Sequence, residues 1–343
     1  MNWIIDLFYF LISVNLLIAA SCLFWVIYHK ILHNKISSTF CFNSLKTLII
    51  FLLISIIGFQ SLHFSTYTAK HLQDVSITNL ILYQISFVIV SIWAFGIIIY
   101  ILITLVNIIK FKRQISFYNA YILDPRYMQI LSRIKCDFNF SKSVNLYSNC
   151  NITIPIVIGG IKPKVILPEN ITSDKELYII MLHEFIHIYR KDLLFKYLLI
   201  ILNGIFWMNP FFLYLSKQLD TWGEYSCDEY ACKHQQHIFS NKEYFTTIFR
   251  YSIQFKQRFF ITTALCSHKS NIEKRIRYFK KSYFTSIFVK YFSILLFVLI
   301  MLIDVYFIYS ASHYQNTFFR TFQQWSTMNI IHVHKTQEAI VPK

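Results

Sequence analysis

Long apolar runs dominate the pattern of hydrophobic and polar positions along this chain. A bilayer core of about 30 Å needs about 20 apolar helical residues. Four segments meet that length, at residues 3–28, 47–64, 80–109 and 284–309. The pattern therefore predicts four membrane-spanning helices, three within residues 1–109 and the fourth within 283–310, followed by a short tail at 311–343.

Residues 110–282, between the third and fourth predicted spans, carry a more mixed pattern. Residues 144–148 and 154–168 are rich in Val and Ile and are bounded by prolines, which predicts two strands joined by a turn. Ser173 and Glu176 then fit a capping box at the start of a largely apolar helix. The expected fold class is a multi-pass α-helical membrane protein with an α+β domain inserted between transmembrane helices 3 and 4.

Composition and charge add a membrane location and an orientation. Hydrophobic residues make up 55% of the chain and charged residues only 15%, which is atypical of soluble proteins. The net charge of +16 comes mostly from residues 110–282 and from Lys30, Lys35 and Lys46 in the first predicted loop. Because basic loops stay in the cytoplasm, both termini are expected outside the cell membrane and residues 110–282 inside. Attraction to the lipid bilayer accounts for this charge, so we expect no direct nucleic-acid contact.

His183, Glu184 and His187 form a His-Glu-x-x-His pattern within the predicted helix. Histidines four residues apart share a helix face and can both bind one Zn²⁺ ion. The glutamate between them can take a proton from the water that attacks a carbonyl. The pattern favours a zinc-dependent metalloendopeptidase in a zincin-like (gluzincin) domain, although a pair of ordinary histidines can arise by chance.

A catalytic zinc site usually has a third protein ligand, and Glu224 is the best candidate. Asp220, Glu224 and Asp228 are spaced four apart, so they share one face if their segment is helical. Three carboxylates on one stripe repel each other unless a cation or a basic partner lies opposite, or unless the face is simply solvated. Asp228, one turn beyond Glu224, is expected to orient a histidine ligand.

Residues 193–208 form another apolar stretch, nearly long enough to span a membrane. A full crossing would separate Glu224 from His183 and His187, so we predict a re-entrant or interfacial helix that turns at Asn209-Pro210. A buried core helix is equally compatible with the proposed ligands. The sequence also leaves open whether the predicted strands pair with an extended substrate or are purely structural.

The stretch from about residue 144 to 228 resembles the membrane zinc metallopeptidases of the BlaR/MecR type, the β-lactam sensor-transducers. The resemblance rests on Gly159-Gly160, His183 to His187 with Arg190 and Asp192, Trp207-Met208-Asn209-Pro210, and Glu224 to Asp228. It implies that His183, His187 and Glu224 are the zinc ligands and that Glu184 is the catalytic base. Asp192 and Asp228 are the residues expected to support the ligands. One departure is Thr221-Trp222-Gly223, where charged residues are expected before the glutamate.

The resemblance also implies a cytoplasmic protein substrate, in particular a transcriptional repressor, and an antirepressor role in signalling. Members that bind β-lactams carry a large outer penicillin-binding sensor domain, for which residues 311–343 are too short. We therefore expect a different signal, a sensing partner, or no receptor role. Two rival functions stay open: an HtpX-type quality-control protease, and a non-catalytic membrane signal transducer whose metal is structural. A homodimer also stays open.

Overall fold

The computed structural model describes most of the chain. The described residues are 2–32, 36–67, 77–116, 120–121, 124–149, 152, 155–169, 171, 173–235, 237–253, 269–280 and seven helical residues between Tyr291 and Tyr306. The chain forms two compact units, one of Met1–Ile31, Lys46–Phe95 and Lys290–Lys343, the other of Leu32–Leu45 and Gly96–Val289. Most of the predicted fourth span and all of the tail at 311–343 lie outside the described residues.

Three long apolar helices open the chain: α1 (Asn2–Leu32), α2 (Ser38–Tyr67) and α3 (Ile77–Ser116). Each holds a stretch apolar enough and long enough to cross a membrane, at Leu7–Ile31, Ser38–Ile57 and Tyr83–Arg113. The first three predicted spans are therefore confirmed as helices of membrane-crossing length and composition. In α3 the side chains of Ile98, Leu102 and Ile103 are each more than half exposed, as expected of a surface that faces lipid.

Helix α2 begins nine residues before the predicted second span, and a polar contact explains the difference. The Ser38 hydroxyl donates to the Glu229 carboxylate, and the Thr39 backbone N–H donates to Glu229 Oε2 over 3.1 Å. These bonds satisfy donors in the first turn of the helix. The first turn of α2 is thus stabilised by hydrogen bonds to Glu229, which the hydrophobic pattern of the sequence does not reveal.

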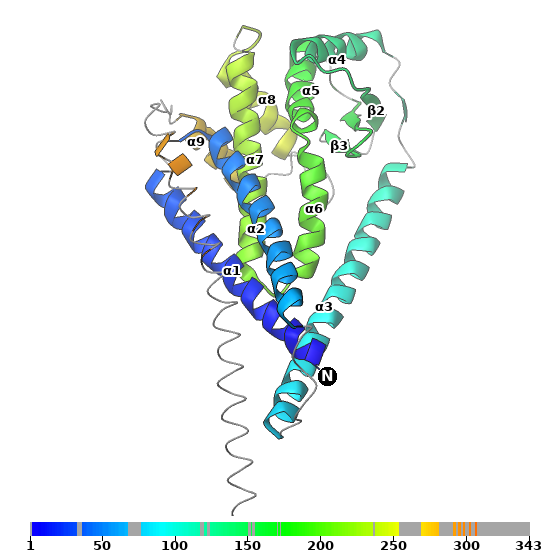
Figure 1. Cartoon of the computed structure of the whole chain (residues 1–343). Helices are drawn as coiled ribbons and strands as arrows, with labels where there is room; N and C mark the ends of the chain where they lie inside the picture. Colours follow the sequence, from blue (N-terminus) through cyan, green and yellow to red (C-terminus); the bar gives the residue numbers. More distant parts are fainter. Residues whose placement is uncertain are drawn as a thin grey trace, which may run out of the picture. The chain divides into compact units, whose positions relative to one another are not determined.

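The second unit combines one small sheet with the remaining helices (Figure 1). Its elements are β1 (Ala120–Tyr121), α4 (Pro125–Asp137), β2 (Asn145–Asn149), β3 (Ile156–Ile158), β4 (Lys164–Pro168), α5 (Asp174–Tyr189), α6 (Asp192–Ile205), α7 (Pro210–His234), α8 (Asn241–Ile253) and α9 (Lys269–Lys280). The strand order is β1-β2-β4-β3. Strands β2 and β4 are parallel, whereas β3 and β4 are antiparallel.

The prediction of one strand over residues 154–168 is wrong, because this segment folds into the β3–β4 hairpin. Gly159 has a φ of +82°, a conformation that side chains rarely adopt. A Cβ there would come within 2.5 Å of the Lys162 carbonyl oxygen. The turn at Gly159 reverses the chain, so β4 pairs with both β3 and β2, and β3 becomes an edge of the described sheet.

Helix α5 lies at the centre of the second unit, with α4, α6, α7 and α8 packed around it. The Ser173 hydroxyl accepts from the Glu176 N–H and caps the helix, as the sequence predicts. All residues from Leu177 to His187 are buried. A helix that is apolar all round is a core helix, so the three polar residues of the His-Glu-x-x-His pattern lie inside the unit.

Helices α6 and α7 form a hairpin whose turn is stabilised by Asn209. Its side chain accepts from the N–H groups of Phe211 and Phe212, and Pro210 occupies the first helical turn. The predicted turn at Asn209-Pro210 is confirmed. Helix α6 runs antiparallel to the later half of α3, because Gly204 lies against Tyr100 while Trp207 lies against Gly96.

Candidate metal centre

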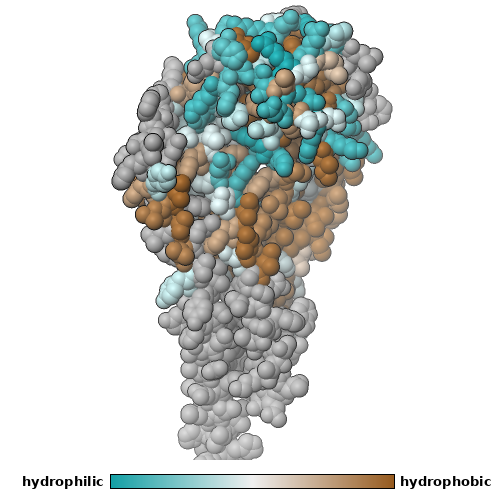
Figure 2. All heavy atoms as spheres, turned by 45° about the horizontal axis from the view of Figure 1, so that its top comes forward, coloured by the Kyte–Doolittle hydropathy of each residue, from teal (hydrophilic) through white to brown (hydrophobic). Residues whose placement is uncertain are grey.

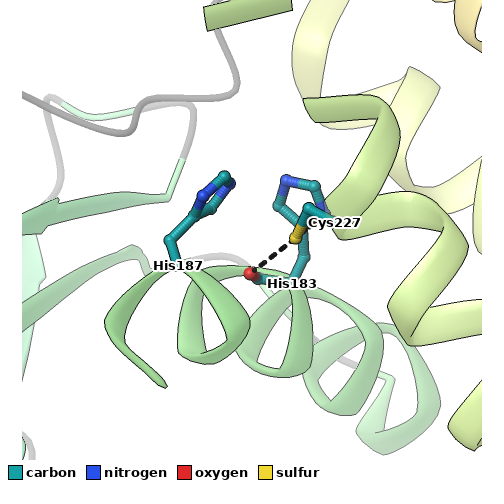
Figure 3. Close-up of side chains that lie close together, drawn as sticks. All are labelled: His183, His187 and Cys227. Atoms are coloured by element: carbon teal, nitrogen blue, oxygen red, sulfur yellow. Dashed lines mark hydrogen bonds between the residues drawn. The ribbon is translucent and has the colours of Figure 1, made fainter. Parts of the chain in front are cut away.

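Helix α5 places the two histidines of the motif side by side. The side chains of His183, Glu184 and His187 are 0%, 0% and 3% exposed. The imidazole centroids of His183 and His187 lie 5.0 Å apart (Figure 3). The spacing of four residues therefore does what the sequence predicts and brings both rings to one face of the helix.

Glu224 of α7 reaches both imidazoles, on the side of their Nε2 atoms. Its Oε2 lies 3.5 Å from His183 Nε2, and its Oε1 lies 3.6 Å from His187 Nε2. Neither Nε2 atom, both of them buried, makes a hydrogen bond within the described part of the chain. Ligand atoms about 2.1 Å from one tetrahedral Zn²⁺ are about 3.4 Å apart. The two separations between Glu224 and the histidines are close to this value.

The segment around Glu224 is regular helix, so the unusual Thr221-Trp222-Gly223 sequence does not disturb it. Trp222 is buried at 3% exposure, and the Gly223 carbonyl accepts a hydrogen bond from Arg190. Burial would raise the pKa of Glu224, but the Arg275 guanidinium and the two histidines lower it well below its usual value. Glu224 is therefore an ionised ligand candidate at neutral pH.

The outer nitrogen of His187 is held by an acid that is itself held by an arginine. His187 Nδ1 lies 2.9 Å from Asp192 Oδ2, and Arg190 donates to the same oxygen through Nε over 3.1 Å. Arg190 also donates to Ser226 Oγ on α7 over 2.9 Å. Asp192, which was expected to support a metal ligand, thus lies beside His187.

The outer nitrogen of His183 reaches its acid through a tyrosine. Its Nδ1 lies 2.7 Å from the Tyr244 hydroxyl, which donates to Asp228 Oδ1 over 2.9 Å. Asp228 itself is 3.7 Å from His183 Nδ1, so the expected direct contact is replaced by a bridge. Burial lowers the pKa of His183, partly offset by Glu224, which favours the neutral ring that a metal needs.

Arg275 of α9 is the cation that the acidic stripe on α7 requires. It is 2% exposed, donates to both Asp228 oxygens, and places Nη1 3.1 Å from Glu224 Oε2. Sequence reasoning missed both Arg275 and Tyr244, since neither belongs to a recognisable motif. The one available signal was the need for a positive group opposite Glu224 and Asp228, which indicates a charge but not its position.

Cys227 is a second group near the histidines, one that no sequence motif singled out. Its sulfur lies within 4.8 Å of the imidazole donors and donates to the His183 carbonyl oxygen over 3.3 Å (Figure 3). It also lies 3.4 Å from His183 Nδ1, the nitrogen that Tyr244 occupies. Burial raises the pKa of this thiol well above its ordinary value. His183, His187 and Cys227 are thus close enough together to hold a metal ion, whereas Glu224 faces the Nε2 atoms of both histidines.

Comparison with known proteins places the chain in a family. Residues 9–279 match the family described as BlaR1 peptidase M56. The chain is 34% identical over 143 residues to "Regulatory protein BlaR1" of Bacillus licheniformis, a match that covers 40% of this chain and 23% of that protein. It is 32% identical over 207 residues to "Methicillin resistance mecR1 protein" of Staphylococcus aureus (strain Mu50 / ATCC 700699), covering 57% of this chain and 34% of that protein.

A mecR1 protein of Staphylococcus epidermidis gives the same 32% identity over 207 residues. The matched regions thus span about a third or less of the length of these curated relatives. The family match, by contrast, extends from the first apolar helix to α9 and includes every residue of the centre described above. The chain therefore belongs to the BlaR1 peptidase M56 family.

Proposed function

We propose that this chain is a membrane-embedded, zinc-dependent metalloendopeptidase whose metal ligands are His183, His187 and Glu224. The observation that carries the proposal is the convergence of two buried imidazole Nε2 atoms on the two Glu224 oxygens, at 3.5 and 3.6 Å. When bound, Zn²⁺ would polarise the scissile carbonyl and acidify the attacking water. The rest of the chemistry falls to side chains of the protein.

Glu184 is the proposed general base. It is buried on α5, between the two histidines in the sequence and completely shielded from bulk water. From this position it accepts a proton from the attacking water and later delivers it to the leaving amine. A positioned base of this kind contributes about 100- to 10,000-fold to the rate.

The proposed substrate is a cytoplasmic protein, and a transcriptional repressor suits the family best. Two relatives carry the names of a regulatory protein and of a resistance protein, which favours a signalling, antirepressor role. Strand β3 supports a peptide substrate, since it is an edge of the described sheet and packs beside α5. An extended segment could add to this edge through backbone hydrogen bonds.

The proposed location is the cytoplasmic face of the cell membrane, with the α6–α7 hairpin dipping halfway into the bilayer. Gly96 and Tyr100, which lie against Trp207 and Gly204 of the hairpin, are near the middle of the Tyr83–Arg113 stretch. From Pro210 to Glu224 helix α7 rises about 21 Å at about 1.5 Å per residue. Half of the hydrocarbon core is about 15 Å thick. The metal centre would then lie just beyond the inner boundary of the hydrocarbon.

Side-chain exposure supports this embedding. Large apolar side chains at Ile201, Met208, Leu213 and Tyr214 of the hairpin are each at least 40% exposed. On the face drawn in Figure 2, hydrophilic and hydrophobic side chains occupy separate areas. An exposed apolar surface of this kind is costly in water and suits lipid.

The test is to purify the full chain in lipid nanodiscs and incubate it with candidate repressors. We expect cleavage that stops when a chelator removes the metal and returns when Zn²⁺ is restored. Cleavage of misfolded membrane proteins but of no repressor would favour a quality-control protease. Binding of a repressor without any chelator-sensitive cleavage would contradict the proposed activity and favour a non-catalytic transducer.

A further inference from the structure

Each histidine of the metal centre is backed by an arginine–aspartate pair, but the two arrangements differ. His187 contacts its acid directly, through the 2.9 Å approach of Nδ1 to Asp192 Oδ2. His183 does not: Tyr244 stands between its Nδ1 and Asp228. Tyr244 is completely buried, as is His183, and Asp228 is 2% exposed. These three side chains lie in the core, where buried polar groups must satisfy their hydrogen bonds with one another.

Hydrogen bonds connect Arg275, Asp228, Tyr244 and His183 in that order, and the ion pair between Arg275 and Asp228 sets the direction of the others. Asp228 accepts from Arg275 Nε over 2.7 Å and from Arg275 Nη2 over 2.5 Å. A carboxylate paired in this way with a guanidinium is ionised and can only accept. The single hydrogen of the Tyr244 hydroxyl must therefore point to Asp228 Oδ1. The Tyr244 oxygen is left as an acceptor for His183.

We propose that Tyr244 and Arg275 are positioning residues of the metal centre, which fix the tautomer of His183 through the relay Arg275–Asp228–Tyr244–His183. Because the tyrosine oxygen only accepts, His183 Nδ1 must carry the ring hydrogen. The lone pair of the neutral imidazole then lies on Nε2, the atom that faces Glu224. The relay also fixes the plane of the ring.

The relay has a consequence for how the centre is assembled. The metal-ligand candidates lie on α5 and α7, whereas Tyr244 lies on α8 and Arg275 on α9. Arg275 Nη1 also lies 3.1 Å from Glu224 Oε2. The same side chain of α9 therefore contacts both Asp228 and the ligand candidate Glu224. The centre is therefore ready to bind metal only when α8 is docked against α5 and α9 against α7.

This inference rests on the proposed function, since it assumes that His183 binds a metal through Nε2. The experiment uses the full-length protein in nanodiscs, stripped of metal by dialysis against a chelator. Zn²⁺ is titrated against a chromophoric chelator of known affinity, and Co²⁺ is added in parallel to record its visible absorption. Tyr244→Phe is compared with Tyr251→Phe, which removes another hydroxyl from the same helix, one that donates to Glu176 over 3.4 Å.

We expect Tyr244→Phe to raise the Kd for Zn²⁺ by about 10- to 100-fold, the usual effect of losing a group that orients a ligand, and to alter the Co²⁺ spectrum. Tyr251→Phe should bind both metals like the parent. Equal Zn²⁺ affinities and identical Co²⁺ spectra for the two variants would overturn the relay and leave the metal centre intact. Parent protein that binds neither metal would instead refute the proposed function itself.

A second pair of variants acts at the far end of the relay and leaves the tyrosine packing unchanged. Arg275→Gln removes the cation from Asp228, whereas Arg277→Gln removes an exposed arginine from the same helix. Arg275→Gln should weaken Zn²⁺ binding by a similar factor, and Arg275→Lys should recover part of the loss. Thermal unfolding of the metal-free variants identifies any that do not fold. If folded Arg275→Gln binds Zn²⁺ as tightly as Arg277→Gln, the relay is wrong.

Discussion

Individual side chains divide the metal centre into a part that is local in sequence and a part that is not. His183, Glu184 and His187 follow one another on a single helix, so their proximity follows from helical geometry alone. Glu224 is 37 residues further along the chain from His187, yet its two oxygens face both imidazoles. Different substitutions should therefore separate binding of the metal from catalysis.

Glu184→Gln should retain metal and lose catalysis. The amide keeps the volume of the carboxylate but cannot accept the proton of the attacking water, so the cleavage rate should fall by about 100- to 10,000-fold. Metal content, measured by elemental analysis, should stay that of the parent. A variant that cleaves a repressor as fast as the parent would contradict the assigned base.

Glu224→Ala should lose metal, whereas Cys227→Ser should keep it. Glu224 faces the free Nε2 atoms, while the Cys227 sulfur donates to a backbone carbonyl. Removing a ligand costs far more affinity than removing a neighbour of the site. Zn²⁺ titration of both variants checks this, and the reverse ranking would make the thiol the third ligand.

Among the helices and strands, the elements with strong local signals match the sequence best. The Ser173 cap, the apolar helix α5 and the turn at Asn209-Pro210 all form where the sequence predicts them. The β3–β4 hairpin was missed because Val and Ile continue across Gly159-Gly160, and apolar composition does not reveal a reversal of the chain. A glycine pair inside a strand pattern was the available signal for this turn.

Gly159→Ala should destabilise the hairpin measurably. The residue has a φ of +82°, and left-handed backbone costs a residue with a Cβ about 1–2 kcal/mol. The added methyl group would also meet the Lys162 carbonyl oxygen at 2.5 Å. Thermal unfolding of the metal-free protein should show a lower midpoint.

Gly160→Ala is the matched control for this substitution. Its Cβ would meet the end of the flexible Leu194 side chain, which can move aside, and its φ does not lie in the left-handed region. Its midpoint should fall less than that of Gly159→Ala. Equal midpoints would show that backbone strain at Gly159 is not what shapes the turn.

At the level of the entire chain, the proposed embedding makes a prediction about depth. In a background with Cys136, Cys150 and Cys266 replaced by serine, a spin label at Met208→Cys should be accessible to oxygen but shielded from a water-soluble nickel chelate. A label at Lys162→Cys, an exposed position on the β3–β4 hairpin, should show the opposite. If the chelate reaches both labels equally, the α6–α7 hairpin does not enter the bilayer.

The amino-acid sequence was enough to indicate three apolar helices of membrane length, the capped helix α5 and the metal-binding pattern on it, because each depends on contacts within a few turns of helix. It also indicated that the acidic stripe on α7 needs a cation. Folding in three dimensions supplied what local patterns do not encode: Arg275 as that cation, Tyr244 between His183 and Asp228, and β3 as an edge strand. These depend on contacts between residues distant in the chain, whose partners only packing selects.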